Sequence, residues 1–295
     1  MEGLRRIGDD AFNGCISLTS IVIPSTVQAI GSDSFRDCLK MKKIQLQNGL
    51  RHIGDNAFHN CISHTSIMIP STVQTIGSES FRDCSKLKNI RLQNGLRRVG
   101  DKAFHNCYSL VSVTIPSSVE AIGVEAFSGC YSLMDFTLSV REMPDSLFRH
   151  SKVKKVHLCE GVRAIGAGFR SCWGVKQVKI PSTVTAIDDR AFFDCDDLNE
   201  IQLREGLLSI GESSFSHTSL KQIRIPSTVT TIDAYSFAEC KTLMEVHLCE
   251  GLESTGMQIV FISRSLLPVI SILTVILFLK ISYLLAGKHF LNASL

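Results

Sequence analysis

Hydrophobic residues return in this chain at a fixed interval of 23 positions. Six phenylalanines keep this interval without exception, and five more continue the series with slips of one or two residues: Phe12, Phe35, Phe58, Phe81, Phe104, Phe127, Phe148, Phe169, Phe192, Phe215 and Phe237. A period of this length is typical of a solenoid, in which each repeat buries its apolar face against its neighbours. The pattern therefore predicts one long array rather than two ordinary domains.

Within each repeat, a short segment alternates apolar and polar residues with a period of two, as expected for a strand with one buried face. Eleven such segments occur, and they end at Ile23, Leu46, Ile69, Leu92, Ile115, Leu138, Leu158, Ile180, Leu203, Ile225 and Leu248. Stacked in parallel at about 4.8 Å per repeat, these strands would form a sheet about 50 Å long. Each repeat then bends at Ile-Gly into a short Ala-Phe segment, for which we expect one helical or 3-10 turn.

Two kinds of turn alternate along the chain, so that the sequence repeats more closely at 46 residues. One turn contains Ile-Pro-Ser-Thr/Ser-Val and the other Asn-Gly or Glu-Gly, with the key residues at Pro24, Pro70, Pro116, Pro181 and Pro226, and at Gly49, Gly95, Gly161, Gly206 and Gly251. Proline ends a strand because it lacks a backbone donor, and glycine accepts positive φ. We interpret both chemistries as solutions to the same turn.

The repeat unit resembles that of the BspA-like (Treponema-type) leucine-rich repeat family, Ile-Gly-x-x-Ala-Phe-x-x-Cys-x-x-Leu-x-x-Ile-x-Ile-Pro-x-x-Val, over residues 4 to about 252. The resemblance implies a β-rich (α/β-type) solenoid: a right-handed superhelix with a parallel sheet on one face and short helical or 3-10 turns on the other. It also implies a surface-exposed binding protein without catalytic residues. Ser151 and Thr218 depart from the pattern by occupying Cys positions, and two 21-residue spacings around Phe148 predict a locally distorted repeat.

Nine of the eleven cysteines follow the repeat phenylalanine by three residues: Cys15, Cys38, Cys61, Cys84, Cys107, Cys130, Cys172, Cys195 and Cys240. This is the period of the fold, and it favours a column of buried thiols over a metal site. Disulfides between adjacent repeats are the alternative, although the odd count argues against a designed framework. Cys159 and Cys249 lie outside the column, where they are either reactive thiols or exposed turn residues.

Motifs for metal binding or catalysis are missing from the sequence. His59 and His105 precede cysteines by two residues, but there is no CxxC pair and the two histidines are two repeats apart, so we expect them to be solvated. No Gly-x-Ser-x-Gly, His-Glu-x-x-His or phosphate-loop motif occurs. The sequence therefore predicts a protein that is not an enzyme and has no cofactor or metal, with a hydrolase as a distant alternative.

The outward-facing strand residues are the first candidates for a binding site. They predict a polar, mildly basic ribbon along the sheet, made of Lys43, Gln45, Asn89, Arg91, Lys155, His157, Gln177, Lys179, Gln222 and Arg224. We expect a macromolecular partner, most simply a protein, to bind this ribbon.

A second candidate is a cationic strip expected beside the ribbon. Arg5-Arg6, Arg51-His52 and Arg97-Arg98 recur on alternate repeats, about 10 Å apart, and the candidate contacts are Arg51, Arg97 and Arg98. Residues 1–110 carry 14 Lys/Arg against 9 Asp/Glu, whereas residues 111–256 carry 14 against 19. An acidic protein, a glycan or another polyanion suits such a strip, and the alternative is ordinary surface charge that favours solubility. Nucleic acid is not expected, because aromatic residues do not alternate with these cations and the second half is acidic.

The period ends after Leu252, and the chain becomes hydrophobic. Residues 266–286 hold 14 Leu, Ile, Val or Phe and one charge, Lys280. Insertion of such a segment is favoured by about 4 to 8 kcal/mol, and its length suits a single transmembrane helix. We therefore predict a repeat array over 1–256 and a hydrophobic tail over 257–295, with membrane attachment near the carboxyl end and otherwise a cytoplasmic location.

Two functions follow from these features. The first is a non-catalytic recognition scaffold that binds a protein through its strand face, with or without a membrane tether. The alternative is a cell-surface adhesin or receptor-like protein that contacts glycans or matrix. The alternative requires a signal peptide. Because the given sequence begins within a repeat, we expect a signal peptide only if a longer amino-terminal sequence precedes it.

Overall fold

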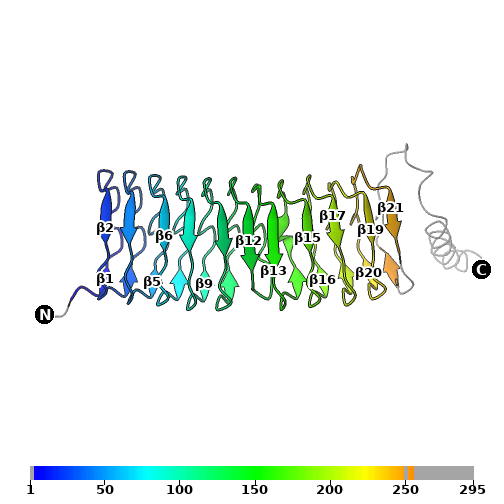
Figure 1. The fold of residues 1–295 in the computed structure, drawn as a ribbon, viewed down its shortest axis with the longest axis horizontal. Helices are drawn as coiled ribbons and strands as arrows, with labels where there is room; N and C mark the ends of the chain where they lie inside the picture. Colours follow the sequence, from blue (N-terminus) through cyan, green and yellow to red (C-terminus); the bar gives the residue numbers. More distant parts are fainter. Residues whose placement is uncertain (1–2, 249–251, 256–295) are drawn as a thin grey trace, which may run out of the picture.

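The computed structural model describes residues 3–248 and 252–255. The predicted transmembrane segment 266–286 and Cys249 lie outside these residues, and within them no helix has the length and hydrophobicity needed to cross a membrane. Each repeat forms one closed loop of chain, here called a rung, and Figure 1 shows the rungs stacked in sequence order along one axis. The predicted solenoid is thus confirmed.

All eleven predicted strands are present, each ending within one residue of its expected position. They pair in parallel with the neighbouring rungs, and we call them the long strands: β2 (Ser20–Val22), β4 (Lys43–Gln45), β6 (Ser66–Met68), β8 (Asn89–Arg91), β10 (Ser112–Thr114), β12 (Asp135–Leu138), β13 (Lys155–Leu158), β15 (Gln177–Lys179), β17 (Glu200–Gln202), β19 (Gln222–Arg224) and β21 (Glu245–His247). They do not form the single continuous sheet that we expected, because the ladder is interrupted after β4, β13 and β17.

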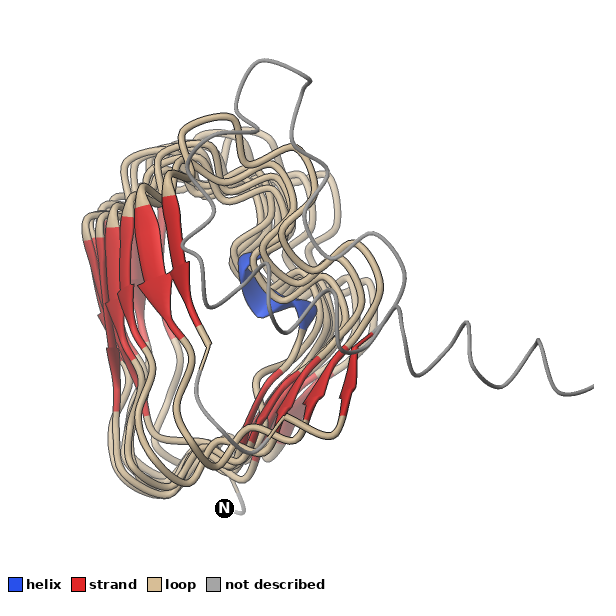
Figure 2. Cartoon of the chain, turned by 90° about the vertical axis from the view of Figure 1, so that its right-hand side faces the viewer, coloured by secondary structure: helices blue, strands red, loops and turns tan. Residues whose placement is uncertain are grey.

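A second set of strands, absent from the sequence prediction, lies at the Ile-Gly bend. These short strands also stack in parallel, in two sheets that end at β11 and resume at β14: β1 (Arg6–Ile7), β3 (Ala29–Ile30), β5 (His52–Ile53), β7 (Thr75–Ile76), β9 (Arg98–Val99), β11 (Ala121–Ile122), β14 (Ala164–Ile165), β16 (Ala186–Ile187), β18 (Ser209–Ile210), β20 (Thr231–Ile232) and β22 (Ser254–Thr255). Figure 2 shows the two sets of strands on different sides of the loop. The solenoid therefore has a long-strand face and a short-strand face.

The Ala-Phe segments form turns rather than the helical turns that we expected. Within the described residues, one short 3-10 helix occurs, η1 (Ala167–Phe169). Elsewhere a residue with positive φ precedes and follows each phenylalanine by two positions, as Asp33 (53°) and Asp37 (57°) do around Phe35. The N–H groups of these three residues donate to carbonyls of the next rung at 2.8 to 2.9 Å. Because these donors bond between rungs, they are not available for the i to i−4 bonds of a helix.

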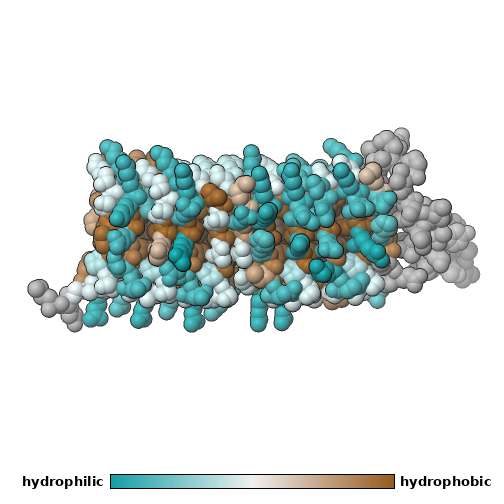
Figure 3. Space-filling model, viewed as in Figure 1, coloured by the Kyte–Doolittle hydropathy of each residue, from teal (hydrophilic) through white to brown (hydrophobic). Residues whose placement is uncertain are grey.

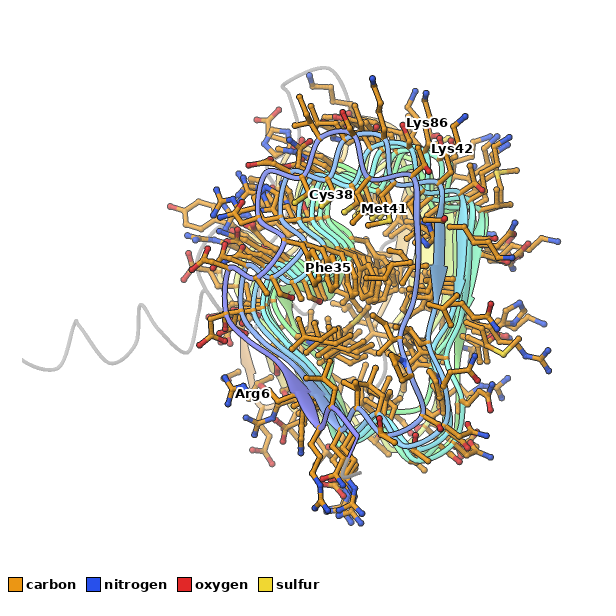
Figure 4. All side chains as sticks on the ribbon, turned by 90° about the vertical axis from the view of Figure 1, so that its left-hand side faces the viewer. Arg6, Phe35, Cys38, Met41, Lys42 and Lys86 are labelled. Atoms are coloured by element: carbon orange, nitrogen blue, oxygen red, sulfur yellow. The ribbon has the colours of Figure 1, made fainter. Side chains whose placement is uncertain are left out.

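The repeat phenylalanines form two stacks through the centre of the solenoid. The rings of Phe35 and Phe58 are parallel within 7° with centroids 5.3 Å apart, and similar pairs run from Phe12 to Phe127 and from Phe169 to Phe237. Figure 4 shows Phe35, Cys38 and Met41 directed into the interior. All three are fully buried, so the 23-residue period is the period of the core.

The distorted repeat predicted around Phe148 is present, and Phe136 interrupts the stack there. Phe136 belongs to β12, in the position that isoleucine or valine fills in other long strands, and its ring stands edge-on between Phe127 (72°, 4.9 Å) and Phe148 (81°, 4.7 Å). The short-strand sheet also breaks at this rung, where only an isolated bridge joins Glu142 to Ala164. Figure 1 shows the stack of rungs continuing through this point.

Candidate functional site

The long-strand face presents one buried residue between two exposed ones in almost every strand. In β8, Ile90 is buried while Asn89 and Arg91 are exposed, and the same pattern recurs in β4, β15 and β19. The predicted ribbon residues all lie exposed on this face: Lys43, Gln45, Asn89, Arg91, Lys155, His157, Gln177, Lys179, Gln222 and Arg224. Figure 3 shows this face, with an apolar band between rows of hydrophilic side chains.

An open groove of about 670 Å³ lies on this face between β17 and β19, where the ladder is interrupted. Lys221, Gln222 and Arg224 line one side and Glu200 and Gln202 the other. The central isoleucines of β17 and β19 are 22 residues apart, one fewer than the regular period. The groove thus brings positively charged, negatively charged and amide side chains together within three rungs.

The arginine strip does not adjoin this ribbon. Arg6 and Arg98 lie on the short strands β1 and β9, and Figure 4 shows Arg6 on a different side from Lys42. The strip is also partly neutralised, because Arg97 lies 3.5 Å from the Glu120 carboxylate. The residues that we predicted as one surface therefore occupy two faces. The separation was invisible in the sequence because the second set of strands was not recognised.

An acidic hollow of about 750 Å³ lies on the short-strand side at the irregular rung. Its lining includes Glu120, Glu142, Asp145 and Asp188. Burial, and then the nearby carboxylates of Asp189, Asp145 and Glu142, raise the pKa of Asp188. Within the described part of the chain, no group of three or more His, Cys, Asp or Glu side chains is arranged to hold a metal ion.

The cysteine column is buried, as the sequence predicted, from Cys38 onward, whereas Cys15 on the first rung is exposed. Each buried thiol in the regular part donates to the phenylalanine carbonyl of the preceding rung, as Cys84 does to Phe58 at 3.2 Å. Burial raises the pKa of Cys84 to about 12 and that of Cys38 to about 11. These thiols are therefore protonated packing groups at neutral pH. Cys159, outside the column, is half-buried.

The histidines differ from the solvated groups that we expected. The His59 side chain is 14% exposed, and its Nε2 lies 3.3 Å from an Asp83 carboxylate oxygen. His105 is half-buried, and its pKa is lowered by burial. Sequence reasoning missed His64, which is fully buried where other rungs have leucine, with Nδ1 3.2 Å from the Lys42 carbonyl. The signal that could have revealed His64 was its position in the repeat, which leucine fills in most other rungs.

Solved structures of two leucine-rich repeat proteins share this architecture. A leucine-rich repeat protein from Bacteroides ovatus superimposes with a TM-score of 0.61 at 24% identity, covering 86% of this chain and 78% of that one. One from Eubacterium ventriosum has a TM-score of 0.50 at 18% identity, with 87% and 79% covered. A leucine-rich cell surface protein from Faecalibacterium prausnitzii is 26% identical, with 91% and 86% covered and a TM-score of 0.49. The search of curated proteins finds no match.

The family assignment rests on the sequence itself. A model described as a BspA type leucine rich repeat region, with six copies, matches residues 5–134, 51–168 and 166–272. These matches extend over most of the array, and their period is that of the buried phenylalanine and cysteine columns. The chain therefore belongs to the BspA-type leucine-rich repeat family.

Proposed function

We propose that this protein is a non-catalytic recognition scaffold that binds a protein partner through its long-strand face. The observation that carries the proposal is the contrast between the two sides of each long strand. The central residue is a buried aliphatic in nearly every rung, whereas the outward positions differ from rung to rung, from Ser66 and Met68 to Asn89 and Arg91. A constant framework that presents a variable surface suits binding, which needs no fixed catalytic group.

The geometry of the face supports recognition of a macromolecule rather than a small molecule. Outward side chains form a grid with about 4.8 Å between rungs, held by strands whose register is fixed by paired neighbours. Such a rigid surface loses little conformational entropy when it binds. The groove between β17 and β19 is open rather than enclosed, which suits a segment of a protein chain.

Charge on the face favours an acidic partner. Lys43, Arg91, Lys155, Lys179 and Arg224 point outward, and none forms an ion pair with a carboxylate of residues 3–248 or 252–255. Unpaired cations on a rim or face increase the association rate of a partner of opposite charge.

The experiment compares two variants of the full chain with equal charge changes. One variant reverses four cations of the long-strand face: Lys43→Glu, Arg91→Glu, Lys179→Glu and Arg224→Glu. The other reverses four exposed arginines on or beside the short strands: Arg51→Glu, Arg98→Glu, Arg141→Glu and Arg163→Glu. Each protein is immobilised, exposed to an extract of the cells that encode it, and its bound proteins are quantified by mass spectrometry.

We expect specific proteins retained by the wild type to be lost from the first variant and kept by the second. Loss from the second variant alone would place binding on the short-strand side, and equal retention by both would contradict the proposal. The alternative of a glycan-binding surface adhesin, the membrane tail over 257–295 and the resulting location stay predictions.

A further inference from the structure

Exposed apolar side chains gather on one edge of the solenoid, where the phenylalanine turns meet the long strands. We call this group the apolar crest; it consists of Tyr108 (40% exposed), Val111 (43%), Tyr131 (46%), Met134 (38%) and Trp173 (37%). None of these residues belongs to the repeat framework. Exposed apolar patches of this kind mark interaction surfaces more often than isolated hydrophobic residues do.

Backbone hydrogen bonds show that lysines flank the crest on both sides. The Val111 N–H donates to the Lys88 carbonyl at 3.1 Å, the Met134 N–H donates to the Val111 carbonyl at 2.7 Å, and the Lys154 N–H donates to the Met134 carbonyl at 3.2 Å. Four consecutive rungs thus carry lysine, valine, methionine and lysine at the equivalent position of the repeat. The apolar pair has a cation on each side.

The flanking lysines have no acidic partners within the chain. None of Lys86, Lys88, Lys152 and Lys154 forms an ion pair with a carboxylate of residues 3–248 or 252–255. Figure 4 shows that Lys86 and Lys42 project into solvent at this edge. Farther toward the carboxyl end of the array, the exposed Asp196 and Asp197 mark the end of the cationic region. A ligand on the crest therefore meets lysines without ion-pair partners on both sides of the apolar surface, and one exposed carboxylate, Asp135, beside Met134.

The aromatic rings of the crest are paired with neighbouring rings, so that one face of each ring is covered. The Tyr108 and Tyr131 rings stack on each other with centroids 5.3 Å apart and planes within 17°. Trp173 stacks in the same way on His150, at 5.0 Å and 26°. Sugars and nucleic-acid bases are usually held against an open ring face, and stacking within these pairs removes one such face from each ring. Protein partners are well suited to such side chains, since Tyr, Trp and Met are enriched at interface centres.

We propose that the apolar crest is a docking site for an acidic protein segment that carries an apolar anchor. The anchor packs on Tyr131 and Met134, and its carboxylates pair with Lys88 and Lys154. This inference rests on the proposed recognition function but names a different surface from the long-strand face.

The test selects 12-residue peptides displayed on phage against the full chain, after removal of phage that bind the variant Tyr131→Ser/Met134→Ser/Trp173→Ser. A selected peptide is then synthesised and its affinity measured by fluorescence anisotropy. We expect selected sequences that combine Asp or Glu with an apolar residue, and an affinity at least tenfold lower for the triple variant. Lys88→Glu/Lys154→Glu should weaken binding similarly and reduce its dependence on salt.

Two controls make the result specific. Tyr235→Ser removes an equally exposed tyrosine on a distant rung and should leave the affinity unchanged. Thermal unfolding of the triple variant should match the wild type within about 2 °C, because the changed side chains are exposed.

Several outcomes would overturn the proposal: selected peptides without acidic residues, equal affinity for the triple variant, or crest-dependent binding of a heparin oligosaccharide or of oligo(dT) instead of the peptide. A dimer in solution that the triple variant converts to a monomer would identify a second copy as the occupant. The long-strand variant should retain peptide binding. If the crest fails while cellular proteins are still lost from the long-strand variant, only the crest proposal is wrong.

Discussion

Gly49 and Thr72, on successive rungs, connect two different kinds of turn through hydrogen bonds. The Gly49 N–H donates to the Thr72 hydroxyl oxygen at 3.1 Å, and that hydroxyl donates to the Leu50 carbonyl at 2.7 Å. The same pair of bonds joins Gly95 to Ser118 and Gly206 to Thr228. The Gly turn and the Pro-Ser-Thr turn are therefore complementary rather than equivalent, which explains the 46-residue period and corrects our interpretation that both do the same job.

Replacing Gly49 by alanine should destabilise the array more than the same change at Gly161. Both residues have positive φ, 117° and 106°, so each alanine pays for backbone strain. At Gly49 the new Cβ would also lie 2.1 Å from the Ser25 carbonyl oxygen, whereas nothing lies within 4 Å at Gly161. We expect losses of about 1 kcal/mol at Gly161 and at least about 2 kcal/mol more at Gly49, measured by urea unfolding. Equal losses would show that the rungs are not in such close contact.

Phe136→Ala should be among the costlier core substitutions, at about 3 to 5 kcal/mol. The ring fills the space between Phe127 and Phe148, and its removal would leave a cavity at the irregular rung. Phe12→Ala is the matched control, since Phe12 is only partly buried at the first rung. Calorimetric unfolding of both variants provides the comparison, and a smaller loss at Phe136 than at Phe12 would contradict this role of the Phe136 ring.

Alkaline pH should destabilise the solenoid through its cysteine column. Burial raises the pKa of Cys84 to about 12 and that of Cys130 to about 12, above the range of an unfolded thiol. The unfolded chain therefore releases these protons first, and stability falls as pH rises above about 8.5. The melting temperature between pH 7 and pH 10 measures the effect, and Cys84→Ala/Cys130→Ala should reduce the slope. An unchanged slope would contradict the contribution of these two thiols.

The same column predicts an order of thiol reactivity. Among the cysteines of residues 3–248, exposed Cys15 should react with iodoacetamide first and half-buried Cys159 next, while the buried thiols should react only after unfolding. Mass spectrometry of peptides from briefly labelled native protein gives this order directly. Labelling of Cys84 or Cys107 before Cys15 would contradict the packing described above.

Acid pH should destabilise the array through His64, and His64→Leu should reduce that sensitivity. Burial lowers the pKa of His64, and its Nε2 has no partner among the described residues. Protons bind the unfolded imidazole first, so the stability present above pH 6.5 is lost as pH falls. Leucine, which other rungs carry here, should increase stability by about 1 to 2 kcal/mol. Melting curves from pH 7.5 to 5 that remain parallel for both proteins would contradict this prediction.

The sequence predicted what depends on the period and missed what depends on contacts between rungs. The phenylalanine and cysteine columns and the eleven long strands follow from spacing alone. The short strands have two residues each, too few to show an alternating pattern. The role of Asp55, whose Oδ1 accepts the Ser78 N–H at 2.7 Å, was likewise hidden because its partner lies 23 residues away.

The same distinction between periodic features and contacts between rungs applies to the candidate surfaces. The exposed ribbon residues were placed correctly because strand alternation fixes which side chains point outward, as with Asn89 and Arg91 around Ile90. The arginine strip was assigned to the wrong side, since nothing in the local pattern reveals that the loop turns between Arg91 and Arg98. The apolar crest was missed because Tyr108 and Val111 occupy variable positions in a turn, outside any periodic pattern.

Site-specific photocrosslinking tests the recognition account most directly. A benzophenone side chain is placed in the full chain at Arg91 or Arg224 on the long-strand face, and at Arg51 or Arg163 beside the short strands as matched exposed controls. After irradiation in an extract of the encoding cells, crosslinked proteins are identified by mass spectrometry. The account predicts discrete crosslinked proteins at Arg91 and Arg224 that unmodified protein competes away, with none at the controls. Crosslinks confined to Arg51 and Arg163, or identical at all four positions, would contradict it.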